Sequence, residues 1–188
     1  MNSKKILECL NSGDYKQHLD ILKVFTDFEK ARKYKGDKIC CFLGDVYDCG
    51  EDITSLGNLE YVGGSLDLQD TPITSLGNIQ YVGGNLYLRY FKMTSLGKLK
   101  GVSGNLDLRS SKITSLGNLE NVGGFLDLSN TKITSLGNLG NVGGSLYLRR
   151  SKITSLGNLK NVGRSIDLRN TPITSLGDVD VGGKIYRN

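Results

Sequence analysis

The sequence predicts an α/β repeat solenoid, in which similar coils of chain stack along one axis behind a helical N-terminal cap. Two observations carry this prediction. The phrase Ile-Thr-Ser-Leu-Gly-Asn, or a near copy of it, returns every twenty residues over more than two thirds of the chain. Each copy also holds a Leu-x-Leu segment that alternates apolar and variable residues, the pattern of a strand with one buried face. A fixed period with one strand in each unit indicates about seven stacked coils.

The chain divides into a predicted cap, residues 1–50, and a predicted solenoid, residues 51–188, because the first part contains no copy of the repeat. Near the N-terminus we expect a short helix. A second helix is expected over 14–33, where an apolar stripe recurs at helical spacing. The segment 39–50 then reads as the first strand or two of the chain.

The seven copies of the repeat begin at Ile53, Ile73, Met93, Ile113, Ile133, Ile153 and Ile173. One coil cannot bury its own apolar face, whereas stacked coils can. The Leu-x-Leu strands of successive coils would pair in parallel, giving a sheet about 30 Å long at ~4.8 Å per strand. Residues such as Leu66, Leu68 and Val82 would point inward and form apolar columns.

Two polar or flexible features recur with the same period. A Gly-Gly pair, first at residues 63–64, precedes most strands and is expected to let the chain turn tightly, with positive φ as one route. Ser103 and Arg164 interrupt this pair. An asparagine column that includes Asn58 and Asn78 is expected to form a hydrogen-bonded ladder.

The repeat resembles the leucine-rich repeat. Leu-x-Leu-x-x-Thr-x-Ile, as in residues 66–73, is similar to that family's Leu-x-Leu-x-x-Asn-x-Leu signature, and the resemblance covers about 53–188. It departs from the family by Thr or Ser in place of Asn and by Gly63 in place of Leu, so a general right-handed parallel β-solenoid stays open. The repeats are also similar to those of leucine-rich proteins from bacteriophages and large viruses. The resemblance implies a recognition surface on the sheet face.

The residues that change from coil to coil are the candidates for function. On the open side of the predicted sheet they form two patches rich in Tyr and Arg, the residues that binding hot spots favour. The candidate partner-binding residues are Tyr87, Arg89, Tyr90, Phe91, Arg109, Phe125, Tyr147, Arg149, Arg150 and Arg169. The function expected from them is protein binding without catalysis, and the phage-like resemblance implies an inhibitor of a bacterial host or defence protein, similar in role to an anti-CRISPR protein.

Other interpretations of the same positions stay open. The Asp and Arg columns can exchange charge pairs between coils and do no more than keep the sheet soluble. The arginines can also bind phosphates while the tyrosines stack on bases, which makes nucleic-acid or nucleotide binding the main alternative. A row of lysines, from Lys92 to Lys152, is interpreted as a solvated edge or as a contact for an anionic partner. A structural or adhesive role is the third possibility.

Several function classes find no support in the sequence. No nucleophile–base pair, metal-ligand spacing or phosphate-binding loop is present, so we expect neither an enzyme nor a cofactor. The net charge of +5 is too small to require an anionic partner. No long apolar run or signal-peptide pattern occurs, which favours a cytoplasmic protein. The cysteines are expected to be reduced thiols; they are Cys9, Cys40, Cys41 and Cys49.

The last coil lacks a predicted cap like that at the N-terminus. It ends in a strand with the residues Lys184, Ile185, Tyr186 and Arg187. A strand edge that is covered by nothing is a template for pairing. This edge is therefore a candidate for self-association as a homodimer or for contact with a partner.

Overall fold

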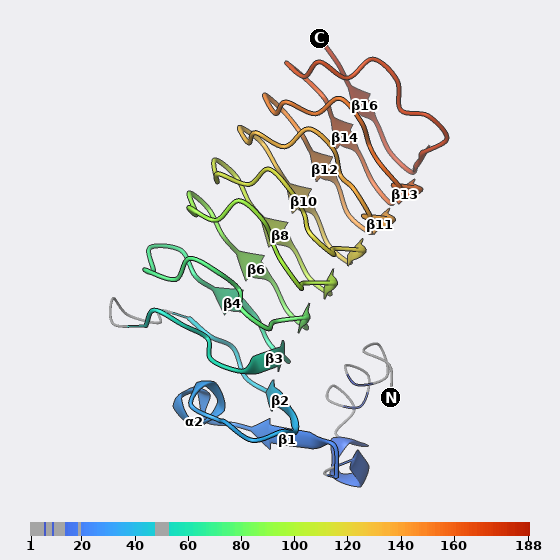
Figure 1. The fold of residues 1–188 in the computed structure, drawn as a ribbon. Coiled ribbons are helices and arrows are strands. Elements are labelled where there is room, and N and C mark those ends of the chain that lie inside the picture. The colour runs from blue at the N-terminus through green and yellow to red at the C-terminus, as the bar shows by residue number, and fades with distance from the viewer. Residues whose placement is uncertain (1–5, 7–8, 10–13, 19, 48–52) are drawn as a thin grey trace.

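The computed structural model describes residues 6, 9, 14–18, 20–47 and 53–188, and it is a parallel β-solenoid. Two rows of short strands run up the stack from the cap to the C-terminal coil (Figure 1). Each coil contributes one strand to each row, and the remaining side of the coil is a loop. The prediction of stacked twenty-residue coils is confirmed.

The seven-stranded sheet is the one that the Leu-x-Leu pattern predicted. All of its strands are parallel, and each residue pairs with its equivalent twenty residues along the chain, or nineteen in the last coil. Its strands are β4 (Leu66–Asp67), β6 (Leu86–Tyr87), β8 (Leu106–Asp107), β10 (Leu126–Asp127), β12 (Leu146–Tyr147), β14 (Ile166–Asp167) and β16 (Ile185–Tyr186).

A second, nine-stranded parallel sheet lies on another side of the coils, and the sequence did not predict it. Its repeat strands precede the Gly-Gly pair, so each pair sits at the turn between the two sheets. Its strands are β1 (Leu22–Phe25), β2 (Ile39–Phe42), β3 (Leu59–Val62), β5 (Tyr81–Val82), β7 (Gly101–Val102), β9 (Asn121–Val122), β11 (Asn141–Val142), β13 (Asn161–Val162) and β15 (Asp180–Val181).

The core is a set of apolar columns between the sheets. One continuous cluster of buried side chains includes Leu66, Leu68, Ile79 and Val82 and their equivalents as far as Leu168, and Val179 and Val181 of the last coil are partly buried against it. Burying one such side chain stabilises the fold by roughly 1.5–3 kcal/mol. Because every coil repeats the same apolar positions, each leucine packs against leucines of the coils above and below it.

The Gly-Gly pair serves close packing and not positive φ, so that part of the prediction is wrong. A Cβ atom at Gly83 would overlap the carbonyl oxygen of Gly63 in the previous coil. The left-handed glycines are instead those of the Ser-Leu-Gly segment, for example Gly117 at φ 59°. The pair is therefore glycine because two coil backbones approach each other there.

The cap is a mixture of strands and short helices, and the predicted continuous helix over 14–33 is wrong. A 3-10 helix, η1 (Asp14–His18), is followed by β1 and then by α2 (Phe28–Arg32). Asp27 caps α2 by accepting from the Lys30 amide at 3.0 Å. Leu22–Phe25 is extended because it pairs with β2, and this pairing outweighs the helical spacing of its apolar residues. The first predicted helix lies mostly outside the described residues.

Strand β2 confirms the strand expected after residue 39, and it joins the cap to the first coil. Cys40 faces the main core, whereas Cys41 faces a small cluster on the other side of the sheet with Leu22 and Tyr61. Cys40 and Cys41 form no disulfide. Burial raises the pKa of the Cys40 thiol to about 11 and also raises that of Cys41, so both stay protonated at neutral pH. Cys49 lies outside the described residues.

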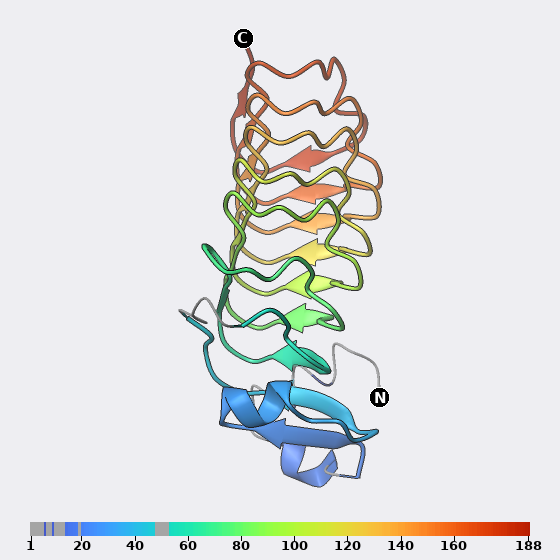
Figure 2. The same cartoon turned by 60° about the vertical axis from the view of Figure 1, so that its left-hand side comes forward.

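The loop side of the coils is joined only in alternate pairs (Figure 2). Thr114 donates its amide to the Thr94 carbonyl, and Thr154 to the Thr134 carbonyl, both at 2.9 Å. No backbone hydrogen bond joins loops 54–57 and 74–77, 74–77 and 94–97, 114–117 and 134–137, or 154–157 and 174–177, all of which are described. From loop 94–97 onward, joined and open gaps therefore alternate with a period of forty residues, whereas the first two gaps are both open. Every loop reads Thr-Ser-Leu-Gly, and no sequence difference among them explains the alternation.

This alternation is testable by amide hydrogen exchange. The amides of Thr114 and Thr154 should exchange more slowly than those of Thr94 and Thr134 by about tenfold or more, because only the first two are hydrogen bonded. Residue-resolved exchange measured by NMR would show the difference. Equal protection along the whole threonine column would contradict the paired arrangement.

Candidate binding face

The variable side chains of the seven-stranded sheet lie on its outer face, as the alternation predicted. The position between the two leucines reads Asp67, Tyr87, Asp107, Asp127, Tyr147, Asp167 and Tyr186 along the stack. Two residues further on, the column reads Gln69, Arg89, Arg109, Ser129, Arg149 and Arg169. Parallel in-register pairing places each of these side chains directly beside its equivalents in the next coils.

Three of the candidate arginines are held in ion pairs with carboxylates of this face. Arg89 Nε lies 2.7 Å from an Asp107 carboxylate oxygen, and an Arg109 terminal nitrogen lies 2.6 Å from the same oxygen. Arg109 Nε also lies 3.2 Å from Asp127 Oδ2. Asp107 is only 1% exposed. The charge-pair interpretation therefore fits Arg89 and Arg109, since removing either arginine would weaken the compensation of a buried carboxylate.

Burial and pairing shift the pKa values of these carboxyl groups in opposite directions. Burial raises the pKa of Asp107, and the hydrogen bond from Arg89 opposes that shift. Burial likewise raises the pKa of Asp127, against the hydrogen bonds from Ser129. At the other end of the face the Arg169 guanidinium, 2.6 Å from Asp167, lowers the pKa of that carboxyl.

Arg169 belongs to the same class of internally paired arginines. In addition to its ion pair with Asp167, its guanidinium carbon lies 5.7 Å from the centre of the Tyr186 ring. A cation over an aromatic face is attracted by the ring quadrupole. Arg169 thus ties the last strand of the sheet to the preceding coil, and this contact explains its presence without a partner.

Four candidates form a different group, the 125–150 patch, defined as Phe125, Tyr147, Arg149 and Arg150. The Phe125 and Tyr147 rings meet edge to face with centroids 6.2 Å apart. Tyr147 is 38% exposed, and both arginines are exposed. Among the described residues, no carboxylate lies within ion-pair distance of Arg149 or Arg150. The patch is therefore aromatic and cationic, with its donors available.

Phe125 gives up a hydrogen bond that its column otherwise makes. Asn85 and Asn105 occupy the same position, and their side-chain oxygens accept from the backbone amide of the next coil at 2.8 Å and 2.9 Å. A phenyl ring cannot accept such a bond, so the ladder is interrupted at Phe125, and it resumes at Ser165, which accepts from the Lys184 amide. The ring contact of the half-buried Phe125 is with Tyr147, and it replaces the hydrogen bond that Asn85 and Asn105 make.

The turn after each strand places one residue in the left-handed region. Asn130 and Asn170 suit φ values of 58° and 59°, because asparagine tolerates this region well. Tyr90 and Arg150 hold φ values of 56° and 58° in the same column, where a long side chain carries more strain. Tyr90 is also 75% exposed, so packing does not offset the strain. Backbone strain at an exposed residue is a pointer to function.

Phe91 is not part of an exposed patch, and that assignment is wrong. The column holds Thr or Ser in the other coils, but the Phe91 ring turns inward, is 5% exposed and joins the core cluster. A groove of about 410 Å³ lies beside it, between residues 70–74 and 89–92. At this corner the ladder bond from Asp70 to the next coil is missing, whereas Tyr90 donates its amide to the Arg109 carbonyl at 3.1 Å. The larger ring explains why the two coils separate here.

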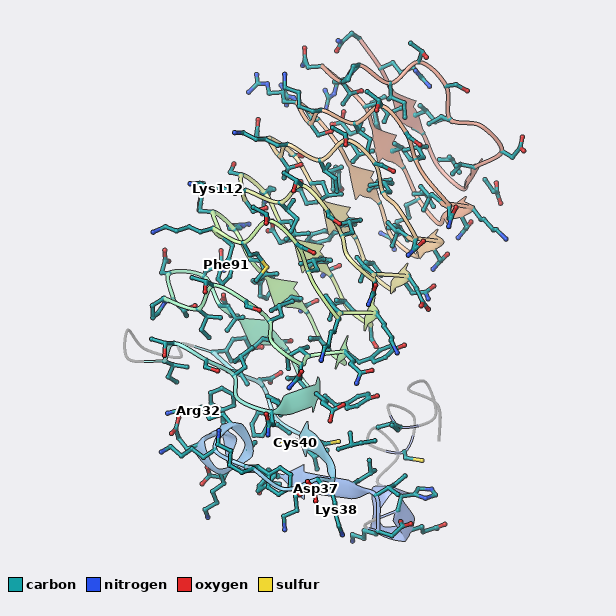
Figure 3. All side chains as sticks on the ribbon, viewed as in Figure 1. Arg32, Asp37, Lys38, Cys40, Phe91 and Lys112 are labelled. Atoms are coloured by element: carbon teal, nitrogen blue, oxygen red, sulfur yellow. The ribbon has the colours of Figure 1, made fainter. Side chains whose placement is uncertain are left out.

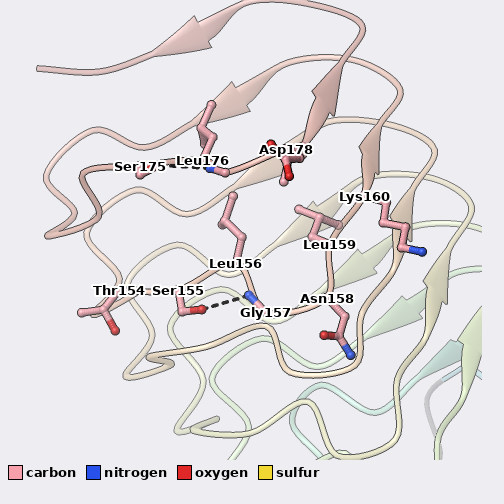
Figure 4. Close-up of a pocket in the computed structure, with 12 residues that line it drawn as sticks. Thr154, Ser155, Leu156, Gly157, Asn158, Leu159, Lys160, Ser175, Leu176 and Asp178 are labelled. Carbon is pink, nitrogen blue, oxygen red and sulfur yellow. Dashed lines mark hydrogen bonds between the residues drawn. The ribbon is translucent and has the colours of Figure 1, made fainter.

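A second groove lies between the last two loops and has about 440 Å³ (Figure 4). It occupies the open gap between loops 154–157 and 174–177. Ser155 and Ser175 turn their hydroxyl oxygens to the amides of Gly157 and Gly177, each at 3.1 Å. The two serine hydroxyls are thus engaged within their own loops, and Thr154 and Asn158 bond to the preceding coil, so we assign the groove no role.

The C-terminal edge is open on one side. Among the described strands, β16 pairs with β14 alone, and Ile185 and Tyr186 are 45% and 43% exposed. Lys184 donates its amide to the Ser165 hydroxyl at 3.1 Å. Arg187 reaches the Thr174 carbonyl at 3.4 Å. The predicted self-association at this edge stays a prediction.

Comparison with family models, with curated proteins and with solved structures finds no match for this chain. Within the described part of the chain, no group of three or more His, Cys, Asp or Glu side chains is placed to hold a metal ion. No helix among those same residues has both the length and the apolar character needed to cross a membrane. The side chains on the outer face of the seven-stranded sheet are therefore the basis for a functional proposal.

The strained corner leads to a stability prediction. Tyr90→Asn and Arg150→Asn should each raise the free energy of unfolding by about 1 kcal/mol, because asparagine relieves the left-handed strain and little packing is lost. Urea denaturation followed by circular dichroism measures the change. The reverse substitution, Asn130→Tyr, should lower the free energy of unfolding by a similar amount, and a stabilising effect of that variant would refute the assignment of strain.

Proposed function

We propose that this chain is a non-enzymatic protein-binding module that uses the outer face of the seven-stranded sheet, with the 125–150 patch at its centre. One observation carries the proposal. At this patch the coil departs from its own repeat in ways that weaken the scaffold: Phe125 interrupts a hydrogen-bond ladder, and Arg150 sits in a strained turn. Residues that the fold disfavours and leaves exposed are candidates for contact with another molecule.

The chemistry of the patch suits a protein partner. Tyr147 and Phe125 supply a rigid aromatic surface, and Arg149 and Arg150 supply directional donors without an internal carboxylate. Aromatic and arginine side chains dominate the energetics of protein interfaces. Tyr87, half-buried on the same face, and the exposed Tyr90 extend this surface toward the N-terminal coils.

The resemblances extend the proposal further. The similarity of the Leu-x-Leu-x-x-Thr-x-Ile unit to leucine-rich repeats favours recognition through the sheet face. The similarity of the repeats to those of phage and large-virus leucine-rich proteins favours a phage-encoded inhibitor of a bacterial host or defence protein, acting in the cytoplasm in the manner of an anti-CRISPR protein. This extension rests on the resemblance, whereas the binding face rests on the side chains.

Nucleic-acid binding is the second candidate, and the two arginines without carboxylate partners favour it. Against it, Asp67, Asp107, Asp127 and Asp167 share the face, and their charges repel phosphates. Three of these carboxylates are matched by arginines of the same face. The positive field that a phosphate backbone would meet is therefore confined to the patch.

The test exploits the repeat, because each patch residue can be replaced by the residue that another coil has at the same position. The patch variant is Phe125→Asn, Tyr147→Asp, Arg149→Ser and Arg150→Asn, which lowers the net charge by three. The control, Lys98→Asn with Lys160→Glu, makes the same charge change with residues native to those columns. These lysines lie outside the sheet face.

Wild type and control should capture the same protein from a bacterial lysate, with or without nuclease treatment, and the patch variant should lose it. With the purified partner, the patch variant should bind at least about thirtyfold more weakly, as expected when hot-spot residues worth ~2 kcal/mol are removed. Calorimetric titration gives these affinities. Capture that disappears after nuclease treatment would favour the nucleic-acid function, and equal capture by the patch variant would place the site elsewhere.

A further inference from the structure

The row of lysines runs along one corner of the solenoid and is built into four successive coils. Lys92, Lys112, Lys132 and Lys152 are all exposed, and no carboxylate among the described residues lies within ion-pair distance of them. At ~4.8 Å per coil the row is about 14 Å long. It starts beside the groove at Phe91, where the Lys112 amide donates to the Phe91 carbonyl at 2.9 Å. Phe91 and Lys112 lie along the same side of the stack (Figure 3).

Protection of a sheet edge does not explain this row. The edges of both sheets are at the ends of the stack, in β1, β4, β15 and β16. The lysines instead follow the stacking axis, at a corner where the coils are already hydrogen bonded to one another. Lysines discourage pairing only at an edge strand. The row therefore adds uncompensated positive charge at a place where the fold does not need it.

The groove at the first lysine differs in character from the row. Its walls include Pro72, Ile73 and Phe91, and Lys92 stands at its rim. Its volume of about 410 Å³ is enough for one large apolar side chain. Asp70, which also lines it, has an exposed side chain that repels acidic groups at this end. The groove is also lined by polar residues, including Thr71, Thr74 and Arg89, so a groove with an apolar wall sits at one end of a cationic row.

We propose that this corner, the lysine row together with the Phe91 groove, binds an extended acidic segment of the partner protein. One apolar or aromatic side chain of the segment enters the groove, and the carboxylates that follow lie along Lys112, Lys132 and Lys152. About five extended residues span the row, at ~3.3 Å per residue. This inference rests on the proposed protein-binding function and names the chemistry of the partner.

A polypeptide fits this corner better than a nucleic acid does. Sequence-independent binding of single strands combines a basic groove with several aromatic rings on which successive bases stack. Tyr90 is the only exposed aromatic side chain beside the described row, whereas Tyr87 and Tyr147 face outward from the strands. A groove with an apolar wall, followed by positive charges, matches a segment with one apolar side chain and several carboxylates.

The probes are fluorescein-labelled twelve-residue peptides, each with one Phe and four Glu, in which the spacing from Phe to the first Glu varies from one to four residues. Matched peptides carry Gln for Glu or Ala for Phe, and a labelled twelve-nucleotide single strand serves as the nucleic-acid probe. Fluorescence anisotropy with the full chain gives the affinities. The variants are Lys132→Gln with Lys152→Gln, and the charge-matched control Lys98→Gln with Lys160→Gln.

At least one acidic peptide should bind more tightly than its Gln counterpart, and the Lys132/Lys152 variant should weaken that binding by about fivefold, with less than about twofold for the control. Phe91→Thr restores the residue type of the other coils. Without the larger ring, the two coils are expected to pack together as they do elsewhere in the stack, which closes the groove. This variant should abolish the advantage of Phe over Ala in the peptide while leaving the charge effect. These two variants separate the cationic row from the groove.

The inference is overturned if no acidic peptide exceeds its Gln counterpart, if both lysine variants weaken binding equally, or if the oligonucleotide binds more tightly than every peptide. Its failure is distinguishable from failure of the proposed function, because that function is tested on the 125–150 patch, which none of these variants touches. A protein partner that is lost by the patch variant but retained by the Lys132/Lys152 variant would refute the corner and leave the sheet face intact.

Discussion

The parallel, in-register pairing of successive coils is the constraint on which the rest of the structure depends. Because each residue pairs with its equivalent in the next coil, every inward position becomes a column of one side-chain type, and Leu66 is followed by Leu86 and Leu106. The same rule puts like charges beside one another on the outside. The molecule resolves this by offsetting Asp and Arg columns by two residues, so that Arg89 and Arg109 converge on Asp107 between them.

Much of the fold could be predicted because periodicity is a strong signal. The Leu-x-Leu alternation located the seven-stranded sheet and its outer face. The second sheet was not predicted because its repeat strands, such as Asn121–Val122, hold one apolar residue directly before the Gly-Gly pair and so show no apolar alternation. The cap misled because Leu22–Phe25 carries a helical spacing of apolar residues, yet pairing with β2 decides its conformation. The sequence also could not show that Gly83 answers a close approach and not a positive φ.

The candidate site was predictable in position but not in how its members behave. The columns of Tyr and Arg identify the face, whereas only the contacts separate the paired Arg109 from the unpaired Arg149. Phe91 was misplaced because a ring in a Thr or Ser column can point either way, and burial favours the inward rotamer. The strain at Arg150 and the interrupted ladder at Phe125 each correspond to a change of residue type that is visible in the sequence columns. Phe125 is the one aromatic residue in a column of Ser and Asn over residues 65–165, and Arg150 stands in a column that otherwise holds Asp, Ser and Asn except at Tyr90.

The alternate pairing of the loops also bears on how such a chain can grow or shrink. In the coils from loop 94–97 onward, duplication or loss of two coils, forty residues, preserves the order in which hydrogen-bonded and open gaps alternate. Gain or loss of a single coil shifts this phase, so that loops now joined would be required to separate, and the reverse. From loop 94–97 onward, the repeating unit of the structure is therefore the coil pair, although the sequence repeats in units of twenty.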